Sequence, residues 1–232
     1  MARKQKAMIK LADRPAVSRI VPFAVYIAFL PIGQALAALL PDSDLRWLYG
    51  LQIALTGSAL ALFWRRYGEL HVRAALRVND VLTAVIAGLL VFVLWINLDH
   101  ATLRFGDAGS GFDPRYADGS INPLLAMVRA VGAAVVVPLM EELFWRSFLA
   151  RWIDRSSFLA YPPQRISMRA IAMSSALFAV EHTLWFAGLL AGIIYAALYR
   201  RSGNLWVPVL SHAVTNGALA WWVVHTGNWR FW

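Results

Sequence analysis

One run of the sequence, Pro138-Leu-Met-Glu141-Glu142-Leu-Phe-Trp-Arg146, places two adjacent acids and an arginine within an otherwise apolar stretch. Charged side chains in such a stretch are costly, so each one is a candidate for function. On an α-helix Glu142 and Arg146 share a face, whereas Glu141 is turned about 100° away. The spacing predicts that Glu142 pairs with Arg146 and leaves Glu141 free for acid-base chemistry. Taken alone, the run fits a structural ion pair equally well.

Two other apolar segments carry polar side chains that suit the same chemistry. Phe178-Ala-Val-Glu181-His182 contributes one imidazole. His212-Ala-Val-Thr-Asn216 contributes a second imidazole and an amide, one helical turn apart. Each segment alone is more often structural, because a lone helix histidine usually packs and a His–Asn pair can bond two helices together. The role of Glu181, beside His182, stays open.

The composition indicates the kind of scaffold that holds these residues. Of the 232 residues, 59% are hydrophobic, 15% are charged and eleven are tryptophan. A soluble domain rarely has such a composition. The apolar runs are continuous rather than alternating, which favours helices over a transmembrane barrel. The sequence therefore predicts an all-α fold, a polytopic transmembrane helix bundle of about seven spans with room for an eighth, re-entrant segment.

The spans are assigned to apolar stretches, and a helix needs about 20 residues to cross a bilayer. They are residues 20–40, 47–64, 81–98, 123–152, 168–185, 186–198 and 205–224. The fifth and sixth must be joined by a very tight turn within 183–188. Gly188-x-x-x-Gly192 is a spacing that lets helices approach closely. Residues 1–19 form a basic cytoplasmic N-terminus, and 20–232 form a single transmembrane domain whose catalytic half is 123–224.

The formal net charge of +9 is distributed in short clusters between the apolar stretches, which indicates topology rather than nucleic-acid binding. The basic residues alternate with the acidic or mixed loops 41–46 and 99–121, so we expect a cytoplasmic N-terminus and an external C-terminus. A cleavable signal peptide ending near Ala35-Leu36-Ala37 is an alternative, but the apolar stretch is longer than a typical signal core. The cytoplasmic basic residues are Arg3, Lys4, Lys6, Lys10, Arg14, Arg19, Arg65, Arg66, Arg73, Arg77, Arg151, Arg155, Arg165, Arg169, Arg200 and Arg201.

The three segments are predicted to place their polar residues at similar depths in the membrane. With a rise of 1.5 Å per residue from the predicted cytoplasmic helix ends, Glu141 lies about 16 Å deep and His182 about 20 Å deep. His212 and Asn216 lie roughly 12 and 18 Å deep by the same rise. Three separate spans thus bring their polar side chains to one level, which favours a shared catalytic site.

Three motifs, Glu141-Glu142-x-x-x-Arg146, Phe178-x-x-x-His182 and His212-x-x-x-Asn216, resemble those of the CPBP family in the same order. That family includes the type II CAAX prenyl endopeptidases. Further stretches resemble the bacterial CAAX-protease-related subgroup associated with exosortase sorting systems. They are Asp44-Leu-Arg-Trp-Leu-Tyr, Trp95-Ile-Asn-Leu-Asp and Arg201-Ser-Gly-Asn-Leu-Trp.

The resemblance implies a glutamate-type intramembrane endopeptidase that needs no cofactor and no metal, in a bacterial inner membrane. Glu141 would act as general base, and His182 would position the attacking water. His212 and Asn216 would donate hydrogen bonds to the oxyanion, while Glu142 and Arg146 support the helix and its charge. Its expected partners are a membrane-associated protein or peptide substrate, the lipid bilayer and components of an exosortase-type sorting system.

Two alternatives remain open on the sequence. A glutamate and two histidines could hold zinc in a membrane metalloprotease, although no His-Glu-x-x-His run is present. The chain could also be a non-enzymatic membrane protein, such as a sorting-system accessory factor or a bacteriocin-immunity protein, with a purely structural polar cluster. Chelation tests the first alternative, and an isosteric change of Glu141 tests the second.

Overall fold

The structure is a computed structural model that describes residues 14–71, 76–107, 109 and 111–232. Predictions for Arg3, Lys4, Lys6, Lys10 and Arg73 lie outside the described residues. The fold is all-α, as the composition predicted. In the described part of the chain, the extended pairing is limited to an isolated antiparallel bridge between Arg115 and Ile121.

Each of the seven predicted stretches contains a helix. Six of the stretches contain α2 (Pro15–Leu39), α3 (Trp47–Leu62), α5 (Val78–Asn97), α9 (Met168–Val180), α10 (Trp185–Ser202) and α11 (Trp206–Thr226), and the short α4 (Gly68–His71) lies between the second and third stretches. The fourth stretch is one continuous helix, Pro123–Asp154, composed of α6 (Pro123–Val131), η3 (Gly132–Val136), α7 (Val137–Glu142), η4 (Leu143–Ala150) and α8 (Arg151–Asp154). Segments η3 and η4 are π-helical.

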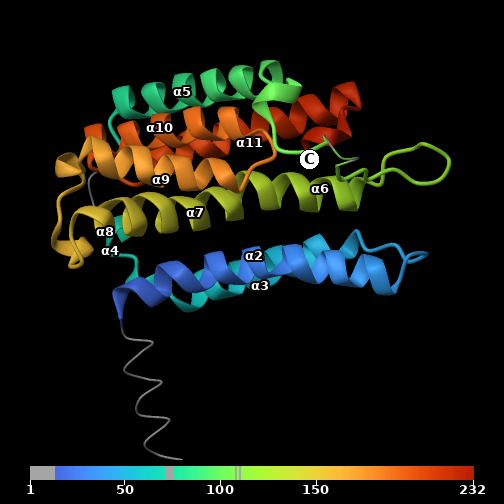
Figure 1. Cartoon of the computed structure of the whole chain (residues 1–232), viewed down its shortest axis with the longest axis horizontal. Coiled ribbons are helices and arrows are strands. Elements are labelled where there is room, and N and C mark those ends of the chain that lie inside the picture. Colours follow the sequence, from blue (N-terminus) through green and yellow to red (C-terminus); the bar gives the residue numbers. More distant parts are fainter. Residues whose placement is uncertain (1–13, 72–75, 108, 110) are drawn as a thin grey trace, which may run out of the picture.

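The helices pack in layers around this long helix. Helices α2 and α3 form a hairpin on one side of it, and α5, α9, α10 and α11 lie on the other side (Figure 1). Helix α11 packs most extensively on α5, and α10 packs on α9. The long helix therefore contacts the N-terminal hairpin, α9, which precedes His182, and α11, which carries His212.

Two helix boundaries differ from their predicted positions by five residues. Helix α2 begins at Pro15, five residues before the predicted span, because proline is well suited to the first turn of a helix. Helix α9 ends at Val180, and the connection to α10 is Glu181–Leu184 rather than a turn within 183–188. The chain leaves the helix just before His182, so that histidine lies in the turn instead of inside a span.

Four helical stretches of the described chain are long and apolar enough to cross a membrane: Pro15–Leu39, Val78–Asn97, Pro123–Asp154 and Trp206–Thr226. Helices α3 and α9 are shorter and apolar. Helix α5 exposes a row of large apolar side chains to its surroundings, which suits contact with lipid. They include Leu82, Ile86, Leu89, Leu90 and Val93.

Helices α9 and α10 approach closely at Gly192, as the Gly188-x-x-x-Gly192 spacing predicted. A Cβ atom on Gly192 would lie 2.9 Å from the Cβ of Ser175 and 3.0 Å from its Cα. Both atoms are held by the backbone of α9, so Ser175 has little room to shift.

We expect Gly192→Ala to lower the unfolding temperature, because overpacking a close helix contact typically destabilises by about 1–3 kcal/mol. Gly57→Ala is the matched control, since a Cβ on this glycine of α3 would meet nothing within 4 Å. That variant should match or slightly exceed the wild type, because alanine favours helix. Thermal unfolding of the purified proteins measures both changes. Equal shifts for the two variants would contradict the close contact.

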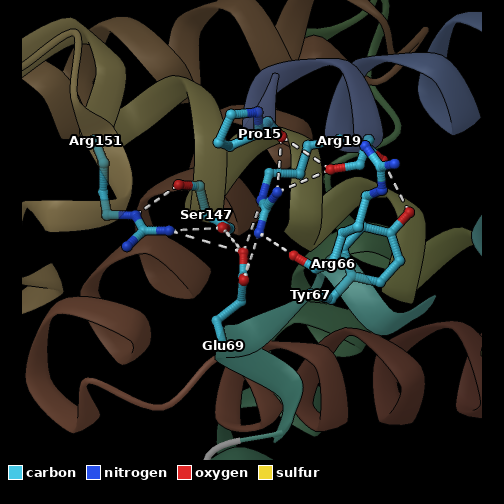
Figure 2. Close-up of polar contacts among 8 residues, drawn as sticks. Pro15, Arg19, Arg66, Tyr67, Glu69, Ser147 and Arg151 are labelled. Atoms are coloured by element: carbon cyan, nitrogen blue, oxygen red, sulfur yellow. Dashed lines mark hydrogen bonds and ion pairs between the residues drawn. The ribbon is translucent and has the colours of Figure 1, made fainter. Parts of the chain in front are cut away.

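An ion network, which we call the inner clamp, fastens the end of the molecule opposite the C-terminus. It consists of Arg19, Glu69, Ser147 and Arg151 (Figure 2). Arg19 donates from Nε to Glu69 Oε1 over 2.9 Å and from Nη2 to Oε2 over 2.6 Å. Ser147 donates its hydroxyl to the same carboxylate, and Arg151 Nη2 lies 3.8 Å from Glu69 Oε1. The clamp thereby joins α2, α4 and the long helix.

The inner clamp changes the interpretation of two basic residues that the sequence assigned to topology. Arg19 is only 1% exposed and Arg151 only 4%, so both are internal ion-pair partners as well as flanking charges. Burial raises the pKa of the Glu69 carboxyl, but hydrogen bonds and charge from Arg19 outweigh it, and this pKa lies below its usual value. Glu69 is therefore ionised at neutral pH and remains a partner for both arginines.

Candidate active site

The two acids of the first motif occupy the last two positions of α7, with a π-helical segment on each side. π-Helical turns are rare and occur frequently at functional sites. Both acids are buried: Glu142 is fully enclosed, and Glu141 is 7% exposed. The long helix thus carries two neighbouring carboxyl groups into the interior of the bundle.

Glu142 has two cationic or polar partners. Its Oε2 lies 3.1 Å from Arg146 Nε, which confirms the predicted pairing, and its Oε1 lies 3.0 Å from His212 Nδ1. Arg146 is 2% exposed, and its guanidinium carbon lies 4.5 Å from the centre of the Phe178 ring. The expectation that Phe178 packs is also met. Glu142 consequently links the long helix to α11 through His212.

Glu141 differs from its neighbour in having no ion pair within the described part of the chain. Its Oε2 is buried and makes no hydrogen bond within the described part of the chain. The residue lines a cavity of about 200 Å³ together with His182, His212 and Asn216. A buried polar atom without a partner requires an explanation, and a site for water or substrate is one. The structure thus brings together the four residues that the sequence nominated.

His182 reaches this cavity from the turn after α9. Its Nδ1 lies 2.7 Å from the Phe178 carbonyl oxygen, one of the carbonyls that the end of a helix leaves unpaired. Because a carbonyl only accepts, Nδ1 carries the proton. In the neutral ring Nε2 is then a hydrogen-bond acceptor. The Trp95 ring packs edge-on against the imidazole with centroids 5.3 Å apart, which holds its orientation.

His212 and Asn216 lie one turn apart on α11, and each already has a partner. Asn216 donates from Nδ2 to the Ala133 carbonyl oxygen over 2.8 Å, which leaves one amide hydrogen for another acceptor. The His212 imidazole stacks on Tyr195 with centroids 4.9 Å apart and an interplanar angle of 20°. Tyr195 donates its hydroxyl to Thr215 over 2.7 Å. These contacts fix the orientation of both side chains.

Several residues of the cavity wall were missed by sequence reasoning. They are Tyr26, Tyr49, Trp95, Arg129, Tyr195 and Thr215. For Arg129 a signal existed, since it is a charge inside a predicted span. The aromatic residues carried none, because aromatic side chains are common throughout this chain.

A second cavity, of about 260 Å³, adjoins the first on the side of the C-terminal residues. Trp95, Arg129, His182, Phe231 and Trp232 line both cavities. Glu181 belongs to the lining of this outer cavity, which answers the question that the sequence left open about its direction. The C-terminus and α6 lie at the end opposite α4 and α8, so the pair of cavities is displaced away from the inner clamp (Figure 1).

No group of three or more His, Cys, Asp or Glu side chains in the described residues is arranged to hold a metal ion. Glu141, His182 and His212 line one cavity without forming such a group. The zinc alternative therefore depends on a chemical test.

Comparison with known families gives one match. Residues 123–218 match the family model described as "Type II CAAX prenyl endopeptidase Rce1-like". No curated protein and no solved structure matches the chain. The matched segment runs from α6 into α11, and it contains both acids, Arg146, both histidines and Asn216. With the four long apolar helices, the match identifies an integral membrane protein.

Proposed function

We propose that this chain, whose residues 123–218 form a CAAX-protease-like domain of the type II prenyl endopeptidase kind, is an intramembrane endopeptidase of the glutamate type. The observation that carries the proposal is the buried Oε2 of Glu141. This atom has no hydrogen-bond partner in the described chain and belongs to a residue that lines a cavity with His182, His212 and Asn216. A carboxylate so placed is available to a water molecule.

In the proposed reaction, Glu141 removes a proton from water while the water oxygen attacks the carbonyl carbon of a peptide bond. Nε2 of His182 accepts a hydrogen bond from the second water hydrogen, which orients the attacking oxygen. The tetrahedral intermediate then collapses with cleavage of the C–N bond. Glu141 returns its proton to the departing nitrogen, so that the products are a carboxylic acid and an amine and the enzyme is unchanged.

The oxyanion of the intermediate needs hydrogen-bond donors, and two side chains of α11 are suited to supply them. Asn216 has one amide hydrogen that is not committed to Ala133. His212 donates from Nε2 when both ring nitrogens carry protons, with Nδ1–H directed to Glu142 over 3.0 Å. Glu142 accepts the hydrogen bond from Nδ1 and so fixes the orientation of the ring, as a carboxylate beside a catalytic histidine does.

Glu142 and Arg146 act as positioning residues in this scheme. Arg146 pairs with Glu142 across 3.1 Å and rests on the Phe178 ring, one turn before His182. Arg146 thereby contacts Phe178, whose carbonyl oxygen orients His182. Its partner Glu142 orients His212, so the pair links the two histidines. Neither residue needs to touch the substrate.

The substrate that suits this site is a membrane-associated protein or peptide, because the cavity is enclosed by apolar helices. We place the protein in a bacterial inner membrane with its N-terminus in the cytoplasm, on the alternation of basic and acidic loops. The stretches that resemble the exosortase-associated subgroup favour a role in protein sorting. In this topology the cavities open toward the external side.

The experiment that tests the function compares membrane proteins from cells that contain the wild type with those that contain Glu141→Gln. Mass spectrometry of protein termini should find new C-termini only with the wild type. Purified wild-type protein in lipid nanodiscs should then generate the same termini from the isolated substrates. If neither sample contains a wild-type-dependent terminus, the polar cluster is structural and the chain is a non-enzymatic membrane protein.

The topology is tested with reporter fusions after Arg66, Asp154, Ser202 and Trp232. The first three should report the cytoplasm and the last the external side, because basic residues cluster in the loops that contain the first three. A cytoplasmic report after Trp232 would mean that one of the shorter helices, α3, α9 or α10, does not cross the membrane.

Peptide cleavage should persist after exhaustive chelation, because the proposed site supplies a base and oxyanion donors from its own side chains. Activity of protein dialysed against EDTA and 1,10-phenanthroline should stay within about twofold of the untreated sample, well below the 10²- to 10³-fold loss expected when a main catalytic group is removed. Elemental analysis provides the control. Stoichiometric zinc, with activity lost on its removal and regained on its return, would support the metalloprotease instead.

A further inference from the structure

Arg129 connects the candidate active site with the outer cavity. It lies on α6, in the same continuous helix as Glu141, and its side chain lines both cavities. Neither the match to a family nor the proposed reaction gives this arginine a role. A permanent cation in the wall of a site that handles peptides needs an explanation, because its cost in an apolar bundle is high.

The surroundings of Arg129 are aromatic rather than acidic. Its guanidinium carbon lies 4.3 Å from the centre of the Tyr49 ring and 5.6 Å from that of Phe112. Nε is buried and has no hydrogen-bond partner in the described chain. Aromatic faces attract a cation without neutralising it, so Arg129 retains its charge and its capacity to bind an anion.

The acids near Arg129 do not neutralise it. Asp99 pairs with Arg104 over 3.2 Å and with Arg230 over 3.0 Å. Glu181 lines the outer cavity too, but the ion pairs of the described residues include none between Glu181 and Arg129. The cavity therefore presents a partly buried guanidinium that has no ion pair within the described part of the chain.

The position of Arg129 along the helix sets a distance from the reacting bond. Twelve residues separate it from Glu141, which corresponds to at most about 18 Å along the helix, and both side chains line the same cavity. An extended peptide advances about 3.3–3.6 Å per residue. A substrate that runs along the long helix would therefore reach Arg129 within about five residues of the bond beside Glu141.

We propose that Arg129 binds a carboxylate of the substrate within about five residues of the scissile bond and so selects which peptides are cleaved. This inference rests on the proposed function and adds the substrate class to it. The carboxylate belongs to an Asp or Glu side chain or to a free C-terminus, since a guanidinium binds both in the same bidentate manner. Tyr49 and Phe112 hold the guanidinium in place, which reduces the entropy lost on binding.

The test uses the full chain in lipid nanodiscs and a library of peptides from digested membrane proteins. The library is supplied in three forms: untreated, with all carboxyl groups methyl-esterified, and with only the C-termini amidated. Mass spectrometry locates the cleavage sites made by the wild type, Arg129→Gln and Arg129→Lys. Arg115→Gln is the matched control, because Arg115 is an exposed arginine of the same end of the molecule and pairs with Asp113 over 2.6 Å.

We expect wild-type sites to have a carboxylate within about five residues, and esterification to reduce their cleavage by about 10- to 100-fold, as for the loss of a hydrogen bond to a charged group. Arg129→Gln should lose this preference, Arg129→Lys should retain part of it, and Arg115→Gln should match the wild type. If amidation alone has the effect of full esterification, the bound group is the C-terminus; otherwise it is a side chain. An acid preference that survives in Arg129→Gln would overturn the proposal.

A binding experiment without turnover distinguishes failure of this proposal from failure of the proposed function. Glu141→Gln protein is incubated with the untreated and esterified libraries, and the retained peptides are quantified without any turnover. Preferential retention of untreated peptides, lost in the Glu141→Gln/Arg129→Gln double variant, supports the carboxylate site even if no protein cleaves the library. Equal retention of both libraries by Glu141→Gln overturns it, whatever the activity of the wild type. Thermal unfolding of Arg129→Lys verifies that the fold is intact.

Discussion

Glu141→Gln should abolish peptide cleavage while the protein unfolds at nearly the wild-type temperature. The amide preserves the shape of the side chain but does not take a proton from water, and loss of a general base lowers rates by about 10²- to 10⁴-fold. Stability should change little, because Glu141 has no ion pair in the described chain and its Oε2 has no hydrogen-bond partner. Cleavage of a membrane-anchored peptide by purified protein measures the first effect, and thermal unfolding measures the second.

Asp118→Asn is a suitable control for this variant, since Asp118 is an exposed acid in the loop before α6 and bonds only to Ser120 in the described chain. It should cleave at the wild-type rate. Near-normal cleavage by Glu141→Gln would mean that this residue is not the base. A folded Glu141→Gln protein that is inactive would in turn weaken a purely structural role for the polar cluster.

The neighbouring variant, Glu142→Gln, should instead fail mainly in stability. Removing the carboxylate leaves the guanidinium of Arg146, which is 2% exposed, without its ion-pair partner at 3.1 Å. Breaking a buried pair on one side typically destabilises by about 3–5 kcal/mol. The amide keeps only one acceptor oxygen, so His212 Nδ1, 3.0 Å away, and Arg146 no longer each have an oxygen of their own. Unfolding in denaturant and the yield of folded protein measure this effect.

A double variant distinguishes an unpaired charge from a general packing defect. Glu142→Gln/Arg146→Met removes both charges, and apolar replacements of buried pairs are often neutral in stability. It should therefore unfold at a higher denaturant concentration than Glu142→Gln alone, although it remains impaired in cleavage. If the double variant is the less stable of the two, Arg146 contributes through its contact with Phe178 rather than through Glu142. A stable but inactive Glu142→Gln beside an active Glu141→Gln would reverse the two roles.

The local pattern of the sequence was sufficient to predict several features. The Glu142–Arg146 pair follows from helical spacing, and it forms although η4 departs from α-helical geometry after Glu142. The convergence of Glu141 with His182, His212 and Asn216 in one cavity follows from similar predicted depths on three segments. Both inferences need only the helical rise and the residue spacing, which local sequence determines.

Other features depend on contacts between distant segments and were not predictable. The contact of His212 with Glu142 joins residues 70 apart and depends on how α11 packs against the long helix. Arg19 was assigned to a flanking segment because its partner, Glu69, lies 50 residues later. The π-helical segments were missed as well, because hydrophobic periodicity does not distinguish one inserted residue in a helix that is apolar on most sides.

The inner clamp also has a consequence for biogenesis, because its parts leave the ribosome at different times. Glu69 and Arg19 are synthesised first, and they can pair when the chain has reached the end of α4. Ser147 and Arg151 follow about 80 residues later, as the sequence separation of 78 between Glu69 and Ser147 requires. During that interval Glu69 pairs with Arg19 alone. Helix α4 is therefore tied to α2 but not yet to the long helix. Completion of the clamp must await the last turns of the helix that carries Glu141.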